Sequence, residues 1–318
     1  MDSGLVFIMS HIDIEGELPI EIIKDHCIRR ASDEQISSIR NYLEQLRGGR
    51  PGFFWPRYDS LVKEERYEGK TSYHFKELPK EQWKYWVITF EGYNHHIHDI
   101  EYVALLLEND LDFGFTFIYN KPSQQGEIYA TSLPGFNIYN KYTSSDIATS
   151  NAITIKSKEL ESIGTYYSWY KDIPEEYNFI EHAVKNFSSL RSIPRGSELI
   201  VVGYFSIIES LVTHPPRLTE TLDSISHQLR NKMILLGKRF SRKINPESYF
   251  LPINTEQLWS KLYGYRSCLA HGSKANFQNN FRALKNQDMI VAFLKENIKE
   301  LLLLSMQQPE FINDLKKC

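Results

Sequence analysis

The segment Leu262-Tyr-Gly-Tyr-Arg-Ser-Cys-Leu-Ala-His-Gly-Ser273 ends in a histidine and a glycine and carries an arginine near its middle. Arg266 and His271 lie five residues apart, and no other arginine in the chain is followed by a histidine at a spacing of five to seven. With 15 arginines and 10 histidines in the sequence, about one such pair is expected by chance. The significance of the pair therefore depends on the elements around it.

The chain beyond Pro174 has the apolar periodicity of helices that are joined by short connections. Apolar residues recur there at spacings of three and four, which is typical of helices with one buried face. Thr255 is the expected N-cap of the helix that carries Arg266, and Gly272 is its expected end. Strand patterns are almost absent, so we expect residues 190–318 to form an all-α helical bundle. Its helices are predicted at 177–190, 197–212, 219–240, 256–271 and 287–307.

Residues 1–180 mix strand and helix patterns, which predicts an α+β protein with a mixed N-terminal domain and a domain boundary between 171 and 195. We expect a helix after Ser32, with Gln35 completing a capping box and Gly48-Gly49 ending the helix. Residues 50–70 are expected to be irregular, and 100–109 to form a short buried helix or strand. A strand or loop that turns helical near 157–163 is expected within 146–168. Other strands are predicted at 5–20, 83–93 and 113–119, and a hairpin at 126–139 that turns at Pro134-Gly135.

The composition is that of a globular protein with two domains, because 318 residues exceed one typical domain. Three widely spaced cysteines favour a reducing, cytoplasmic location. The chain begins without a leader-like segment and has no run of about 18 apolar residues, so we expect no membrane association.

The two halves of the chain differ in charge. Residues 191–318 contain 18 lysines and arginines against 11 acidic residues, whereas residues 1–190 contain 19 against 29. The basic half could meet a polyanion, or the two halves could pack on each other. A basic run is the candidate track for an RNA backbone, although such runs are usually solvated faces. It comprises Arg230, Lys232, Lys238 and Arg239, followed by Arg242 and Lys243.

A family resemblance rests on the helix that carries Arg266 and on two segments before it. Helices with an Arg-x4-His motif near one helix end resemble the HEPN superfamily (higher eukaryotes and prokaryotes nucleotide-binding). The ApeA-type HEPN domain of phage-defence proteins is similar over about residues 195–310. The sequence segments on which this resemblance rests are Phe205-Ser-Ile-Ile-Glu-Ser-Leu211, Ser224-Ile-Ser226, Tyr265-Arg266-Ser267 and Ala270-His271-Gly272.

This resemblance implies a metal-independent endoribonuclease that acts in phage defence by abortive infection, or as a toxin. It implies RNA, with tRNA as one candidate, as substrate, a homodimer through the C-terminal helices, and a phage-derived trigger or an antitoxin as a further partner. Many active members carry Asn, Asp or His directly after the motif arginine, where this chain has Ser267. The alternative is therefore a catalytically inactive HEPN bundle that binds RNA or mediates dimerisation.

Arg266 and His271 are the residue types that metal-free RNA cleavage needs. A histidine can take the proton of the 2′-hydroxyl, and an arginine can stabilise charge on the phosphoryl oxygens. The product would be a 2′,3′-cyclic phosphate, and DNA would survive because it lacks the 2′-hydroxyl. Residues five apart differ by about 140° around a helix. The two side chains can therefore meet only at a helix end or across a two-fold axis between two copies.

Supporting roles are expected for residues near the motif. Glu209 is a charge in an apolar helix, so it lies either at the exposed position of that helix or beside Arg266 as its partner. Ser267 and Tyr263 flank Arg266 and are further candidates. Cys268 and His271 could also be a nucleophile and its base, but no orienting acid lies nearby in sequence.

The N-terminal half offers weaker alternatives. His95-His96-Ile-His98, with His11, Asp13 and Glu15, could suggest metal or carbohydrate binding, but it lacks a recognised ligand spacing, so we expect no metal. The aromatic residues at 166–170 could stack on bases or belong to a core. No Walker loop, Gly-x-Gly-x-x-Gly or Gly-x-Ser-x-Gly motif is present, so no cofactor is expected.

Overall fold

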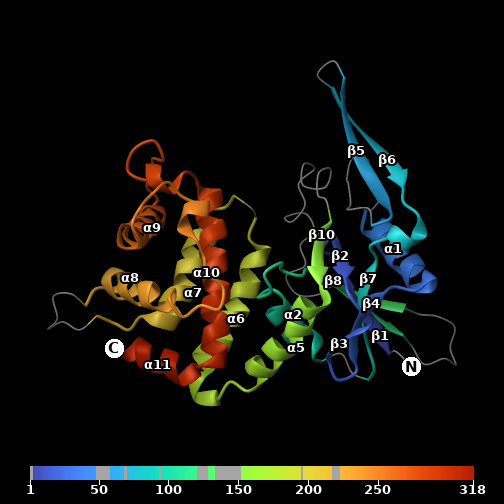
Figure 1. Ribbon diagram of the computed structural model, residues 1–318, viewed down its shortest axis with the longest axis horizontal. Coiled ribbons are helices and arrows are strands. Elements are labelled where there is room, and N and C mark those ends of the chain that lie inside the picture. Colours follow the sequence, from blue (N-terminus) through green and yellow to red (C-terminus); the bar gives the residue numbers. More distant parts are fainter. Residues whose placement is uncertain are drawn as a thin grey trace. The chain divides into compact units, whose positions relative to one another are not determined.

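The computed structural model describes residues 3–47, 58–67, 70–92, 95–119, 128–132, 152–194, 196–216 and 223–318. The chain is mixed α+β and folds into two compact units, Met1–Tyr167 and Ser168–Cys318 (Figure 1). The division falls within helix α5 (Ser157–Lys171), a few residues before the boundary that the sequence suggested. None of the helices in the described ranges combines the length and apolar character needed to cross a bilayer.

A six-stranded antiparallel sheet is the main element of the first unit (Figure 1). Central strands β1 and β7 are buried along their whole length, as their nearly continuous apolar sequences require. In spatial order the strands are β3 (Ile20–Ile23), β4 (His26–Arg30), β7 (Trp86–Phe90), β1 (Gly4–Ile8), β8 (Phe113–Tyr119) and β9 (Ile128–Ser132).

Helix α1 (Asp33–Arg47) begins with the predicted capping box. The Gln35 amide donates to Ser32 Oγ at 3.3 Å, and the Ser32 amide donates to Gln35 Oε1 at 2.9 Å. Its apolar residues Ile36, Ile39 and Leu43 are buried in one cluster with residues of the sheet and of the segments beside its strands. Those partners are Leu5, Phe7, Met9, Tyr58, Tyr85, Val87, Phe115 and Phe117.

Three expectations for the first unit need correction or refinement. The prediction of irregular structure was wrong for the described residues from 58 to 70, because β5 (Ser60–Tyr67) pairs with β6 (Lys70–Glu77) in a hairpin. The single strand expected at 5–20 is divided into β1 and β2 (Ile12–Glu15), and β2 shows the expected alternation with Ile12 and Ile14 buried. The ambiguous segment at 100–109 contributes to helix α2 (Ile97–Ala104).

Strand β10 (Ile153–Lys156) pairs with β2 in parallel and runs directly into α5, which extends well past the predicted helical residues. The strand predicted at Trp83–Tyr93 is shorter than expected, because β7 covers only Trp86–Phe90. The Phe113–Tyr119 prediction is confirmed in β8. Gly48-Gly49 and Pro134-Gly135 lie outside the described residues.

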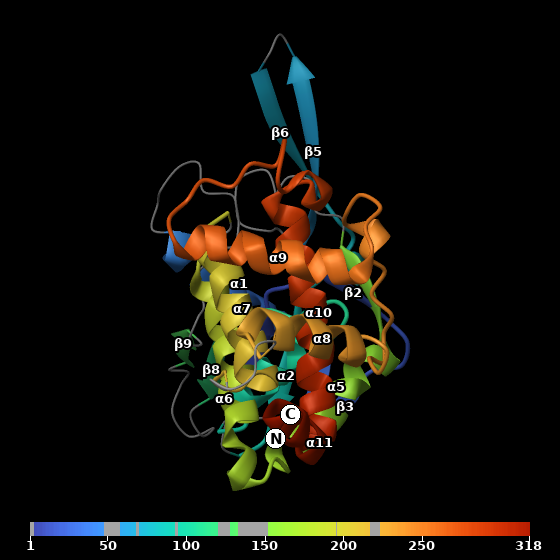
Figure 2. The same cartoon turned by 90° about the vertical axis from the view of Figure 1, so that its left-hand side faces the viewer.

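The elements described within residues 168–318 are helical. Helix α7 packs against all the other long helices of this unit (Figure 2). Helix α10 coincides with the prediction, α8 begins later than expected, and α11 was not anticipated. The helices are α6 (Asn178–Ser189), α7 (Leu199–Val212), α8 (Ile225–Leu236), α9 (Thr255–Ala270), α10 (Gln287–Gln307) and α11 (Pro309–Lys317).

The two ends of α9 are set by its flanking residues. Asn254, rather than the predicted Thr255, is the N-cap, and its side chain accepts a hydrogen bond from the Gln257 amide at 2.8 Å. His271 is the C-cap, and Gly272 follows with φ +67°. A glycine adopts this left-handed conformation without a Cβ penalty, so the predicted end of the helix is confirmed.

Candidate active site on helix α9

Arg266 and Glu209 form an ion pair where α9 crosses α7. The Arg266 Nη2 donates to Glu209 Oε2 at 3.2 Å, and the two side chains are 26% and 20% exposed. Glu209 is therefore the partner of Arg266 rather than a fully exposed residue. Burial raises the pKa of Glu209, and the positive charge of Arg266 opposes that shift without cancelling it.

This ion pair leaves hydrogen-bonding capacity unused. Glu209 Oε1 and Arg266 Nε are buried and have no hydrogen-bond partner among the described residues. The carboxylate and the guanidinium thus meet through one hydrogen bond rather than through a two-bond fork. This arrangement orients Arg266 but leaves its Nε without a hydrogen-bond partner in the described residues.

Tyr263 lies on the same side of α9 as Arg266. The Arg266 Cζ is 5.6 Å from the centroid of the Tyr263 ring, which meets Phe205 of α7 edge to face. Burial and the nearby Glu209 charge raise the pKa of Tyr263, and Arg266 opposes the shift. Tyr263 therefore belongs to the same local group, as the sequence suggested.

His271 lies apart from this group within one protomer. Its side chain is exposed, and its amide donates to the Ser267 carbonyl at 3.1 Å. No hydrogen bond joins the side chains of Arg266 and His271 in the described part of the chain. Ser260, Gly264 and Ser267 of α9 lie at spacings of four, three and four residues that lead to His271.

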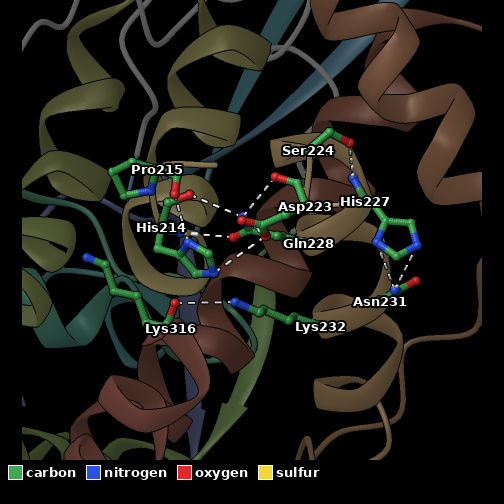
Figure 3. Close-up of polar contacts among 9 residues, drawn as sticks. All are labelled: His214, Pro215, Asp223, Ser224, His227, Gln228, Asn231, Lys232 and Lys316. Carbon is green, nitrogen blue, oxygen red and sulfur yellow. Dashed lines mark hydrogen bonds and ion pairs between the residues drawn. The ribbon is translucent and has the colours of Figure 1, made fainter. Parts of the chain in front are cut away.

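The predicted basic run does not form one exposed track. Lys232 is buried at 8% exposure, and its ammonium donates to the Lys316 carbonyl at 3.3 Å (Figure 3). Its expected role in RNA binding is corrected accordingly, because α8 turns this residue toward the carbonyl groups at the end of α11. Arg239 stacks its guanidinium 4.6 Å from the Phe311 ring centroid, and Arg230 contacts Asn231 at 3.4 Å. Lys238 is exposed.

Arg242, at the end of the same run, belongs to an internal network. Its Nε donates to Glu300 Oε1 at 2.6 Å, and its Nη1 donates to Glu296 Oε2 at 3.3 Å. Glu300 is 2% exposed and also accepts the Arg242 amide at 3.0 Å. Buried carboxylates are stable when paired in this way, so Arg242 fastens the loop after α8 to α10.

A polar cluster at the ends of α7 and α8 was missed by the sequence interpretation (Figure 3). Gln228 is 5% exposed; it accepts the His214 amide at 3.0 Å and donates to the His214 carbonyl at 3.2 Å and to Asp223 Oδ1 at 2.7 Å. His214 Nε2 lies 3.6 Å from Asp223 Oδ1. A glutamine inside the apolar pattern of α8 was the available signal.

The remaining candidates have structural contacts of their own. The Cys268 thiol donates to the Ser273 carbonyl at 3.2 Å, rather than to His271. His96 Nδ1 lies 2.6 Å from the Tyr167 hydroxyl, and Tyr170 is only 5% exposed. Within the described ranges, no group of three or more His, Cys, Asp or Glu side chains is placed to hold a metal ion.

Comparisons with protein-family models, with curated proteins and with solved structures found no match to this chain. The function of the chain must therefore be inferred from the chemistry of α9 and its neighbours.

Proposed function

We propose that this protein is a metal-independent endoribonuclease of HEPN type that acts in phage defence by abortive infection or as a toxin. The observation that carries the proposal is the Arg266–Glu209 pair. It fixes a permanently charged guanidinium on α9, and an exposed histidine ends the same helix. Arginine and histidine are the residue types that cleavage by 2′-hydroxyl attack requires.

In the proposed reaction, His271 takes the proton of a 2′-hydroxyl. The 2′-oxygen forms a bond to the adjacent phosphorus, and the bond from phosphorus to the 5′-oxygen breaks. A general acid protonates the leaving 5′-oxygen, and the products are a 2′,3′-cyclic phosphate and a 5′-hydroxyl. Arg266 stabilises the charge on the phosphoryl oxygens. Glu209 is a positioning residue, because it holds Arg266 through Nη2 only.

The site is proposed to be completed by a second copy of the chain. Arg266 and His271 are about 140° apart around a helix, and no hydrogen bond joins their side chains in the described residues of one protomer. Phe281 of the same chain lies next to Gly264, so a second α9 is proposed to approach near Ser267 and His271 across a two-fold axis. Arg266 of one copy could then face His271 of the other. The first unit would sense a phage-derived trigger or restrain the nuclease, and an antitoxin is a further possible partner.

An inactive bundle that binds RNA or mediates dimerisation is the second candidate. The observation in its favour is that the Arg266 charge is offset by Glu209, together with Ser267 after the motif arginine. In this case RNA would bind without being cleaved.

Cleavage assays in EDTA distinguish the two functions. Labelled RNA, including tRNA and RNA from phage-infected cells, is incubated with wild type, Arg266→Ala, His271→Ala and the control His182→Ala, which changes an exposed histidine on α6. We expect wild type and the control to produce 2′,3′-cyclic ends and to leave DNA intact, whereas the two motif variants are inactive. Failure of wild type on every RNA would overturn the nuclease proposal. Cleavage only with a divalent ion would overturn the mechanism.

A further inference from the structure

The connection between α9 and α10 is basic and contains no acidic residue. From His271 to Gln287 the sequence contains Lys274, Arg282 and Lys285 but no aspartate or glutamate. All three cationic side chains are exposed. Three neighbouring amide side chains are exposed as well, those of Gln278, Asn279 and Asn280. The segment therefore offers hydrogen-bond donors and positive charge directly after the proposed catalytic histidine.

An aromatic anchor holds this connection against α9. Tyr265 is completely buried, and its ring lies 5.4 Å from both Phe277 and Phe281, measured between centroids. Burial and the charge of Glu198 raise the pKa of Tyr265 to about 12. The Tyr265 hydroxyl also donates to Gln287 Oε1 at 3.3 Å. The middle of the connection is thus packed against α9 through Phe277 and Phe281.

Hydrogen bonds show that the connection runs back along α9. The Ser273 carbonyl lies beside Cys268, and Lys261 Nζ donates to the Asn280 carbonyl at 2.9 Å. The Leu251 amide, located before α9, donates to the Ala283 carbonyl at 3.0 Å. Figure 2 shows this return path from the end of α9 to the start of α10. From Cys268 to Lys261 the path covers about 10 Å of helix.

The three cations of the connection differ from the basic run after α8. Lys274, Arg282 and Lys285 have no ion-pair partner among the residues that the structure describes. In the basic run, by contrast, Lys232 is buried and Arg242 is paired with two glutamates. The charge of the connection is therefore available to an external anion, whereas Lys232 and Arg242 of the run are occupied within the protein.

We propose that residues 272–286, here called the α9–α10 strip, bind the backbone of single-stranded RNA and lead it toward His271. This inference rests on the proposed function for the identity of the polyanion. Lysine and arginine bind phosphates without regard to base sequence. Because Tyr265, Phe277 and Phe281 hold the segment in place, little conformational entropy is lost when RNA binds. Two acidic residues lie close to the ends of this arrangement: Glu198 acts on the Tyr265 hydroxyl, and Asp288 is in the first turn of α10.

Binding of a labelled single-stranded RNA tests the strip. Fluorescence anisotropy is measured in EDTA at several salt concentrations in the His271→Ala background, so that the RNA stays intact. One variant carries Lys274→Gln, Arg282→Gln and Lys285→Gln. Its control removes the same charge from exposed lysines of the first unit, through Lys76→Gln, Lys156→Gln and Lys158→Gln. Thermal melting of both variants checks that the fold is retained.

We expect the strip variant to bind RNA at least tenfold more weakly at 0.1 M salt. The steepness of the plot of log binding constant against log salt concentration should decrease by about 2, because each of the three lost phosphate contacts contributes about 0.7. The control should bind like its parent. Equal losses in both variants, a loss in the control alone, or no RNA binding by the parent would overturn the inference. Selective loss of binding with a wild type that never cleaves RNA supports the strip and refutes the nuclease. If wild type cleaves RNA and the strip variant binds RNA as well as its parent, the nuclease is supported and the strip is refuted.

Discussion

Glu209 shows how one side chain can acquire its role from a partner that is distant in sequence. It lies in the apolar helix α7, where a carboxylate is costly unless it is paired. Arg266, 57 residues later, supplies that partner. Burial nevertheless dominates, because the pKa of Glu209 stays raised despite the nearby positive charge. The pair is therefore oriented at some cost in stability, as is common where a charged group serves a site.

Replacing Glu209 by glutamine should change the pH dependence of stability. A carboxyl group with a raised folded-state pKa favours the folded protein below its unfolded pKa, which is 4.5. That contribution is lost as the pH rises through the raised value. Glu209→Gln lacks this loss. The melting temperature of the variant minus that of wild type should therefore increase between pH 4 and pH 7. A difference that stays constant or decreases over this range, measured by thermal melts, would contradict the assignment.

Arg266 should not be replaceable by lysine. Lysine keeps the charge but loses the planar fork that can contact Glu209 and a phosphate together. For Arg266→Lys we expect single-turnover cleavage about 100-fold slower than wild type, with RNA affinity within a few fold. Full cleavage by this variant would show that charge alone is needed, and the Glu209 contact would then have no positioning role.

Gln228 joins the two helices α7 and α8 through backbone groups. It bonds both the amide and the carbonyl of His214 and also the Asp223 carboxylate. A buried backbone group without a partner costs about 1–3 kcal/mol. This one side chain therefore links the residue that follows the end of α7 to the first turn of α8.

Removal of the Gln228 amide should destabilise the protein. Gln228→Leu keeps the size of the side chain but leaves the His214 amide and carbonyl unpaired, so we expect a loss of about 2–4 kcal/mol in unfolding free energy. Asn231→Ala is the matched control, since this exposed residue on the same helix contacts only neighbouring exposed groups. Chemical denaturation measures both variants. Equal losses of unfolding free energy in the two variants would show that the Gln228 contacts stabilise the protein no more than a surface contact does.

The two compact units differ in composition as well as in fold. An acidic unit is built on an antiparallel sheet, and the regular elements described in the basic unit are helices joined by loops. The proposed site lies in the basic unit, where attraction of a polyanion is favoured. No hydrogen bond joins Arg266 and His271 in the described residues of one protomer, and in the proposed mechanism two copies of the chain share the chemistry.

Mixing two inactive variants tests whether the site is shared. If Arg266 of one copy acts with His271 of the other, a heterodimer of Arg266→Ala and His271→Ala contains one intact site. Random exchange of subunits should then restore about a quarter of wild-type cleavage. Light scattering should show a dimer at the working concentration. A fully active monomer, or no restored activity after confirmed exchange, would contradict the shared site.

Local patterns were sufficient to define much of the secondary structure. The capping box at Ser32 and Gln35, the end of α9 at Gly272 and the full extent of α10 depend on interactions within a few residues, so the sequence reveals them. The hairpin of β5 and β6 was missed because its sequence is polar and its strands are stabilised by pairing with each other.

Which side chains meet could be learned only from the folded chain. The sequence singled out Arg266, His271 and Glu209, but the pairing of Glu209 with Arg266 depends on how α7 crosses α9. The burial of Lys232, the Gln228 cluster and the return of the α9–α10 strip along α9 also depend on packing between distant segments. Periodicity shows which face of a helix is buried, but it carries no information about the partner that covers that face.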